Sequence, residues 1–202
     1  MTHLLLIRHA ENDYTRTGKL AGWLAGVHLN EAGQKQAQAL AERLSKAPIQ
    51  AMYSSPLERA RETAAPLAQA KGLEVKIRPG LGEVRYGRWT GRSLKVLART
   101  RLWRVVQQQP SAMQFPEGET LRGVQARIVE ELEQIGRSHP KALVAAFSHA
   151  DPIKLAVAYY LGVPLDLFQR FGVSTASITL LRLGQGQPTL VKLNDTGLFE
   201  AR

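Results

Sequence analysis

Six short apolar runs, separated by segments of helical period, constrain this chain more than any other feature of its sequence. The runs lie at His3–Ile7, Ile49–Tyr53, Val75–Ile77, Leu143–Phe147, Ile178–Leu183 and Thr189–Leu193. Runs this short and apolar are typical of strands in a buried sheet. Because they alternate with helical segments, the pattern predicts an α/β fold, a three-layer sandwich with helices on both faces of a mostly parallel central sheet. The last two runs are joined by GQGQP, which predicts a hairpin at one edge of that sheet.

The segments between the runs predict four main helices. The first follows Asn30, which can cap it. The second is predicted to start with Ser55 as N-cap and Pro56 in the first helical position, and to end at Gly72. A third is predicted from about residue 121 to 136. The fourth is predicted from Asp151, as its N-cap, to about residue 162.

One stretch, residues 84–119, does not follow the strand–helix alternation. It contains RYGRWTGRS and QQQPSAMQFPEGE around a short basic helix predicted over Leu94–Gln108. Inserts of this kind often cover a site. We therefore predict a single domain over residues 1–202, with 84–119 as a cap insert.

Composition narrows the possible environments and partners. The chain has no Cys, so thiolate metal ligands, disulfides and a cysteine nucleophile are excluded. No spacing of His and acidic residues suggests a metal centre, and we predict neither a metal nor a cofactor. The net charge of +10 favours anionic partners, but the arginines form no basic block, so nucleic acid is not predicted. No signal peptide or membrane span is evident, and we predict a cytoplasmic protein.

Polar residues that suit phosphate chemistry follow three of the predicted strands. Arg8 and His9 follow the first, Ser54 and Ser55 the second, and Ser148 and His149 the fourth. In open α/β sheets, ligands gather beyond the carboxyl ends of the strands. A neutral imidazole can attack phosphorus, and a guanidinium group matches phosphate oxygens. The sequence therefore predicts a phosphoryl site, whereas His3, His28 and His139 are expected to be structural or exposed.

Several motifs, in order along nearly the whole chain, resemble those of the histidine phosphatase (phosphoglycerate mutase-like) superfamily. LIRHAEN resembles its RHG signature, and YSSPLERARETA resembles its Ser-Pro-x-x-Arg-Ala segment. LGEVRYGRWTGRS resembles its acid-bearing loop, FPEGETLRGVQARI the stretch after that loop, and FSHAD its second histidine. The chain is closest in style to the short phosphatases of that superfamily, such as α-ribazole and broad-specificity phosphatases.

The resemblance implies a role for each matching residue. His9 would be the nucleophile, Glu83 the general acid, and His149 a further catalytic residue. Arg8, Arg59 and His149 would bind the phosphate. The residues alone do not choose between Arg59 and Arg61, or between Glu83 and the later Glu117 and Glu119.

The sequence departs from the family pattern at three positions near the site. Ala10 replaces the usual glycine, and Asp151 stands two residues after His149, where glycine is common. Thr15 occupies a position at which many members have asparagine, so Asn12 or the Thr15 hydroxyl is expected to supply that contact. With Ser148, these two form the predicted supporting shell of the site.

We predict a phosphomonoesterase that acts on a small phosphorylated metabolite through a phosphohistidine, with no nucleic acid or membrane partner. One alternative is a phosphoglycerate mutase-type phosphomutase, although family mutases are typically longer. The other is a non-catalytic phosphate-binding module. Six arginines of the insert suggest a substrate with more than one negative charge, although they also suit a solvated helix face: Arg85, Arg88, Arg92, Arg99, Arg101 and Arg104.

Overall fold

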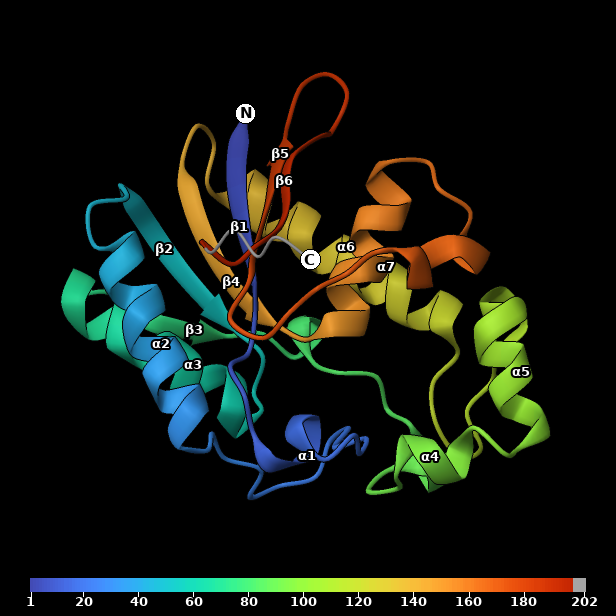
Figure 1. The fold of residues 1–202 in the computed structure, drawn as a ribbon. Coiled ribbons are helices and arrows are strands. Elements are labelled where there is room, and N and C mark those ends of the chain that lie inside the picture. Colours follow the sequence, from blue (N-terminus) through green and yellow to red (C-terminus); the bar gives the residue numbers. More distant parts are fainter. Residues whose placement is uncertain (198–202) are drawn as a thin grey trace.

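A computed structural model describes residues 1–197, which form a six-stranded mixed sheet in the order β3-β2-β4-β1-β5-β6 (Figure 1). Strands β1, β2, β3 and β4 run parallel, and the β5–β6 hairpin runs antiparallel at one edge. The predictions of a mostly parallel sheet and an edge hairpin are confirmed. The strands span Thr2–Arg8 (β1), Ile49–Ser54 (β2), Val75–Ile77 (β3), Leu143–Ser148 (β4), Ile178–Leu183 (β5) and Thr189–Asp195 (β6).

Helices cover both faces of the sheet, as predicted (Figure 1). Helices α2 (Glu31–Leu44) and α3 (Glu58–Lys71) cover one face. Helices α6 (Leu121–Ser138) and α7 (Ala150–Tyr160) cover the other. No helix within residues 1–197 is long and apolar enough to cross a membrane.

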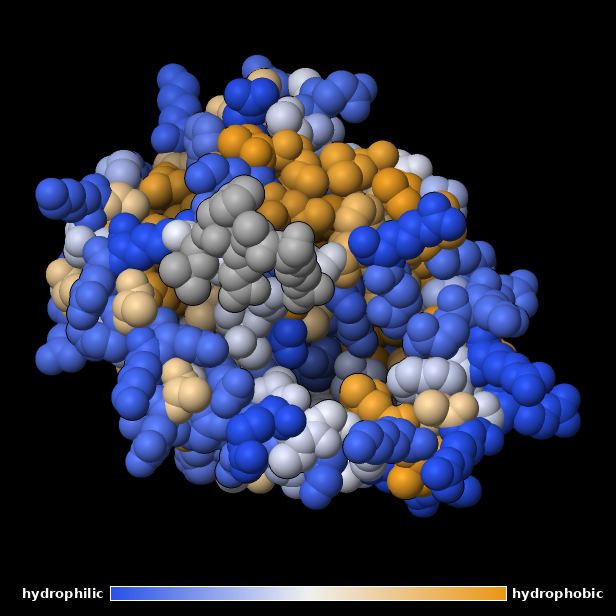
Figure 2. All heavy atoms as spheres, in the orientation of Figure 1, coloured by the Kyte–Doolittle hydropathy of each residue, from blue (hydrophilic) through white to orange (hydrophobic). Residues whose placement is uncertain are grey.

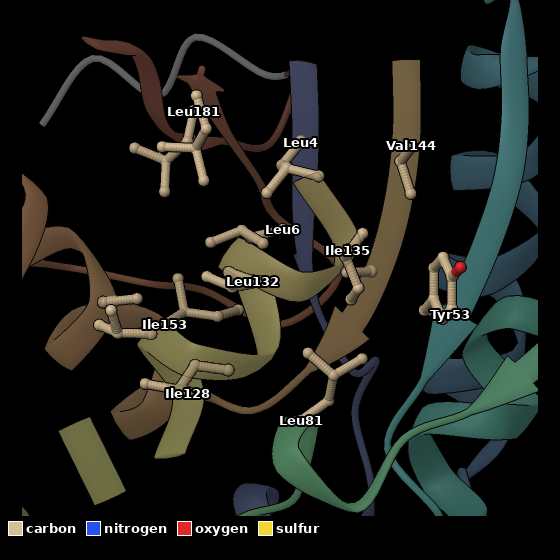
Figure 3. Close-up of a cluster of buried hydrophobic side chains, with 14 of the residues drawn as sticks. Leu4, Leu6, Tyr53, Leu81, Ile128, Leu132, Ile135, Val144, Ile153 and Leu181 are labelled. Carbon is tan, nitrogen blue, oxygen red and sulfur yellow. The ribbon is translucent and has the colours of Figure 1, made fainter. Parts of the chain in front are cut away.

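The core on the α6–α7 side shows why these helices lie where they do (Figure 3). Ile128, Leu132 and Ile135 recur at helical spacing along α6 and are at most 1% exposed. They pack against Leu4 and Leu6, which alternate on one face of β1. Burying this stripe fixes α6 against the sheet, and with it the connection into β4.

Two predicted helix starts are wrong, and both errors concern residues near the strand ends. Helix α3 begins at Glu58 with Leu57 as its N-cap, so Ser55 and Pro56 lie outside it. The backbone stays extended there because the ladder continues past β2, with the Ser55 amide donating to the Phe147 carbonyl at 2.9 Å. Helix α7 begins at Ala150 with His149 in the N-cap position, so Asp151 lies in the first turn.

The insert at 84–119 contains two helices where one was predicted. Helix α4 spans Leu94–Leu97 and α5 spans Arg101–Gln108. The break occurs at residues 98–100 because Thr100 caps α5, its side chain accepting from the Trp103 amide. Apolar insert residues, including Trp89 and Phe115, pack with Leu121 of α6 and Leu155 of α7. That the chain is a single domain with this insert as its cap stays a prediction.

Shorter elements complete the fold. Helix α1 spans Asp13–Arg16 and lies below the carboxyl ends of the parallel strands in Figure 1. Within the described part of the chain, four 3-10 helices span Pro79–Leu81 (η1), Gly87–Trp89 (η2), Pro110–Ala112 (η3) and Leu165–Arg170 (η4). The η1 turn leads directly into Glu83.

Candidate active site

The predicted site residues converge at the carboxyl ends of β1, β2 and β4. Arg8 and Ser148 are register partners on adjacent parallel strands, and the His9 amide donates to the Ser148 carbonyl at 2.9 Å. The next residue on each strand is a histidine, and the rings of His9 and His149 lie 5.1 Å apart between centroids. Two segments distant in the sequence thus place two buried imidazoles side by side.

His9 is held so that one ring nitrogen is available. Its Nδ1 lies 2.7 Å from the Ala10 carbonyl oxygen. A carbonyl only accepts, so Nδ1 carries the proton and Nε2 carries the lone pair. Burial lowers the pKa of His9 well below its usual value, and the nearby Arg59 and Arg8 lower it further. The ring is therefore neutral at neutral pH, as a nitrogen nucleophile must be.

The loop that carries His9 is tied to helix α3 through one hydroxyl. Thr63 Oγ1 accepts from the Ala10 amide at 2.9 Å and donates to the Arg59 carbonyl at 2.6 Å. The contact fixes the spacing between the nucleophile loop and Arg59. Sequence reasoning did not single out Thr63, because a buried helical threonine has an ordinary packing role in most proteins.

Three side chains around His9 contain buried nitrogens without a hydrogen-bond partner among the described residues. Arg8 uses Nη1 to bind the Val173 carbonyl at 2.7 Å, which leaves its Nε unpaired. Arg59, 1% exposed, uses Nη2 to bind the Gly22 carbonyl at 2.8 Å, and its Nε and Nη1 are unpaired. Asn12 Nδ2 is also unpaired. Leaving buried donors unpaired is costly, so together they make a site ready to bind an anion.

His149 contributes a further unpaired nitrogen. Its Nε2 lies 2.8 Å from Ser55 Oγ, which accepts from the Leu57 amide. The Ser55 hydroxyl can therefore donate its proton to Nε2, and a neutral His149 then carries its own proton on Nδ1. Nδ1 has no hydrogen-bond partner within residues 1–197. Ser55, predicted as a helix cap, instead orients this histidine.

Glu83 is the acidic residue that the fold brings to the histidines. Its Oε2 lies 3.9 Å from His149 Nδ1, and its Oε1 accepts from the Val84 amide at 2.9 Å. Burial raises the pKa of Glu83 to about 7, assisted by the nearby Asp151 carboxylate and opposed by Arg59. The two other candidate acids lie elsewhere, since Glu119 binds Arg127 and Glu117 pairs with Arg88.

Five side-chain hydrogen bonds hold the backbone that precedes and includes Glu83. Ser148 Oγ donates to the Leu81 carbonyl at 2.7 Å, and Arg127 Nη1 donates to the Gly80 and Gly82 carbonyls at 2.9 and 3.0 Å. Trp23 Nε1 and Arg127 Nη2 donate to the Glu83 carbonyl at 2.6 and 3.3 Å. Ser148 thus contacts the turn that leads into Glu83, and its supporting role in the site stays a prediction. Arg127 was missed because no local pattern marks an arginine that binds distant carbonyls.

Asn12 and Thr15 form a capping box at the start of α1. Asn12 Oδ1 accepts from the Thr15 amide at 3.0 Å. Thr15 Oγ1 accepts from the Asn12 amide at 3.0 Å and donates to the Asn12 carbonyl at 2.8 Å. The Thr15 hydroxyl proton is thus already used, whereas the Asn12 amide group keeps a free donor.

Of the groups described above, Arg8, His9, Asn12, Thr15, Arg59 and Glu83 line a cavity of about 350 Å³, whereas His149 is fully buried and is not among the lining residues. Figure 2 shows a hollow in this face, below the grey atoms, with hydrophilic atoms deep inside it. Beyond Arg8, His9, Arg59 and Glu83, the wall includes aromatic residues of the insert and two charged residues of α7. These further residues are Tyr86, Trp89, Trp103, Phe115, Asp151 and Lys154. None of the six insert arginines lines this cavity, and of the two candidate helix arginines only Arg59 does.

The described residues contain no group of three or more His, Asp or Glu that could hold a metal ion. Positive charge at the site comes from the guanidinium groups of Arg8 and Arg59, and Lys19 and Lys154 also line the cavity. Guanidinium and imidazole donors around one cavity suit the oxygens of a phosphate monoester.

Comparison with known proteins places this geometry in a family. Residues 4–196 match the model of the histidine phosphatase superfamily, branch 1. The chain is 33% identical over 201 residues to phosphoserine phosphatase 1 of Hydrogenobacter thermophilus, covering 97% of this chain and 93% of the relative. It is 27% identical to a 2,3-bisphosphoglycerate-dependent phosphoglycerate mutase of Thermoplasma acidophilum, over 91% of this chain and 88% of the relative.

A solved structure supports the same placement. A mutant phosphoserine phosphatase of Entamoeba histolytica, in complex with phosphoserine, superposes with a TM-score of 0.88 at 25% identity. The match covers 97% of this chain and 98% of the other. From the family match over residues 4–196 and these relatives, we conclude that this chain belongs to the histidine phosphatase superfamily, branch 1, and is a hydrolase of the phosphatase class.

Proposed function

We propose that this enzyme hydrolyses a small phosphomonoester through a phosphohistidine on His9. The observation that carries the proposal is the hydrogen bond from Nδ1 to the Ala10 carbonyl, which directs the lone pair to Nε2 of a neutral, cavity-lining ring. In the first step Nε2 attacks phosphorus. An N–P bond forms as the ester P–O bond breaks.

The unpaired donors around His9 are placed to hold the phosphate. Arg8, Arg59, Asn12 and His149 supply N–H groups that no described residue satisfies. Phosphoryl transfer depends mainly on positioning and on neutralising the charge of the three non-reacting oxygens. These side chains perform that role from fixed positions, because each is bonded on its other side to the protein.

Glu83 is placed to act as the general acid and then as the general base. With a pKa near 7 it is largely protonated at slightly acidic pH. It gives its proton to the leaving oxygen as the P–O bond breaks. The resulting carboxylate takes a proton from water, which attacks phosphorus, breaks the N–P bond and returns His9 to its free state.

We further propose that residues 1–202 act as one domain and that the insert at 84–119 is a cap over the cavity. Tyr86, Trp89, Trp103 and Phe115 of the insert line the wall, which supports this role. A small phosphorylated metabolite is the partner that such a cavity fits. The absence of a metal requirement and a cytoplasmic location remain predictions from the sequence.

Trapping the phosphoenzyme tests this proposal. Brief mixing with labelled substrate, followed by an alkaline quench, should leave label on the peptide that contains His9, because a P–N bond survives base and hydrolyses in acid. His9→Ala should abolish the label, whereas His149→Ala should only weaken it. The exposed Lys46→Gln serves as a control and should label like the wild type.

Two results would contradict the proposal. Turnover of p-nitrophenyl phosphate without any label on His9 would exclude the phosphohistidine. Binding of phosphate without turnover of any phosphomonoester would indicate a non-catalytic binding module.

A further inference from the structure

A pair of opposite charges, Asp151 and Lys154, lines the cavity one helical turn apart on α7. Their side chains are only 22% and 17% exposed, and Asp151 Oδ1 lies 3.6 Å from Lys154 Nζ. Neither residue has been assigned a contact with the substrate in the reaction described above, although Asp151 helps to raise the pKa of Glu83. An α-helix places residues i and i+3 on one face, so both charged groups meet the same region of the cavity.

The carboxylate of Asp151 is unexpected in an anion-binding cavity. A negative charge in the wall opposes the binding of every phosphate monoester, and it lies close enough to Glu83 and Arg8 to influence both. Capping does not explain it, because His149 occupies the N-cap position. A residue with this cost is expected to make a compensating contact with part of the substrate.

Both groups keep capacity for a ligand. Asp151 Oδ2 accepts from the Tyr86 hydroxyl at 3.0 Å, and that contact fixes the carboxylate in the wall. Its Oδ1 has, among residues 1–197, only the 3.6 Å contact with Lys154 Nζ. Lys154 Nζ donates to Gln169 Oε1 at 3.4 Å, which leaves further N–H donors of the ammonium group.

We infer that Asp151 and Lys154 recognise a zwitterionic leaving group, one that has an ammonium and a carboxylate on the same carbon, as in a phosphorylated hydroxy-amino acid. The ammonium of the leaving group binds the Asp151 carboxylate, and the carboxylate of the leaving group binds the Lys154 ammonium. Each charge of the ligand thus faces an opposite charge in the cavity wall. The enzyme thereby selects its substrate by the leaving group, which is the part attached to the ester oxygen that Glu83 protonates. This inference rests on the proposed phosphatase activity.

Four matched phosphate esters separate the two contacts. O-Phosphoserine has both charged groups, O-phosphoethanolamine only the ammonium, 3-phosphooxypropanoate only the carboxylate, and ethyl phosphate neither. Asp151→Asn should lower kcat/KM for the two ammonium esters at least about tenfold relative to ethyl phosphate, as expected for loss of a charge-assisted hydrogen bond. Lys154→Gln should do the same for the two carboxylate esters.

Controls separate recognition from structure. Tyr86→Phe removes the hydrogen bond to Asp151 but keeps both charges, and it should retain the preference for the ammonium esters. Glu133→Gln and Lys46→Gln change the net charge by the same amounts as Asp151→Asn and Lys154→Gln, but at exposed positions that do not line the cavity. They should leave the ratios of kcat/KM among the four esters unchanged. Thermal unfolding of each variant checks that it is folded.

The outcomes distinguish this inference from the function on which it rests. One outcome is that wild-type enzyme hydrolyses ethyl phosphate in a His9-dependent way while Asp151→Asn and Lys154→Gln lower kcat/KM equally for all four esters. In that case recognition of a zwitterion is wrong and the phosphatase assignment stands. If the wild type hydrolyses none of the four esters or p-nitrophenyl phosphate, both fail.

Discussion

Glu83 is a buried carboxyl group whose protonation is the part of the site most sensitive to pH. If it supplies the proton for the leaving oxygen, kcat/KM should fall as the pH rises through about 7, its pKa in the folded protein. Glu83→Gln should lower kcat for an alkyl phosphate by about 100-fold or more, and less for p-nitrophenyl phosphate, whose leaving group scarcely needs a proton. Equal losses on both esters would argue against the acid role.

Measurements of stability on Glu83→Gln provide a control, because the variant should be less active but, at high pH, more stable than the wild type. A carboxyl group whose pKa is raised by burial binds its proton more tightly in the folded than in the unfolded state. Its contribution to stability is present below the unfolded pKa of about 4.3 and is lost as the pH rises through about 7. Glu83→Gln should therefore unfold at a higher temperature than the wild type at pH 8, with the difference disappearing near pH 4.

At the scale of elements, the turn from η1 to Glu83 is fixed from three directions by α6, β4 and the loop after α1. Arg127→Gln removes the hydrogen bonds from α6 to the Gly80, Gly82 and Glu83 carbonyls, and with them the ion pair with Glu119. We expect kcat for alkyl phosphates to fall about tenfold to 100-fold, because a small displacement of an acid is costly. Turnover of p-nitrophenyl phosphate should fall less. Arg137→Gln, an exposed change on the same helix, should have no effect on either ester.

Close packing leaves no room for a larger residue in that turn. A Cβ at Gly82 would lie 2.4 Å from Trp23 Cζ2, and Trp23 Nε1 binds the Glu83 carbonyl. Trp23 does not line the cavity, but it contacts the backbone of Glu83, which does.

A structural feature could be predicted from the sequence where a local pattern of residues determines it, and not where distant contacts do. The strands, the four main helices and the convergence of Arg8, His9 and His149 follow from hydrophobic periodicity and from strand ends meeting at one edge. The starts of α3 and α7 do not, because the extended ladder at Ser55 and the hydrogen bond between Tyr86 and Asp151 are tertiary contacts. The residues alone do not choose Glu83 over Glu117 and Glu119; the family resemblance makes that choice, and of the three only Glu83 lines the cavity.

For the whole molecule, the open question is where the phosphoryl group goes after it reaches His9. Chain length does not decide this, because the Thermoplasma mutase aligns over 88% of its own length. We expect water to accept the phosphoryl group, so phosphate release should equal substrate consumption with glycerate or sugar phosphates. Quantitative phosphorus NMR of the reaction measures both. Accumulation of a positional isomer faster than free phosphate would make the enzyme a mutase.

The position of β1 in the sheet has a consequence for how the protein is made. Its neighbours are β4 and β5, so the strand that leads to His9 is synthesised long before either partner. At ribosomal speeds of about 5 to 20 residues per second, its apolar side chains wait on the order of ten seconds for a place in the sheet. The nascent chain therefore cannot assemble the nucleophile early, and its first strand must be shielded from other chains until the second half emerges.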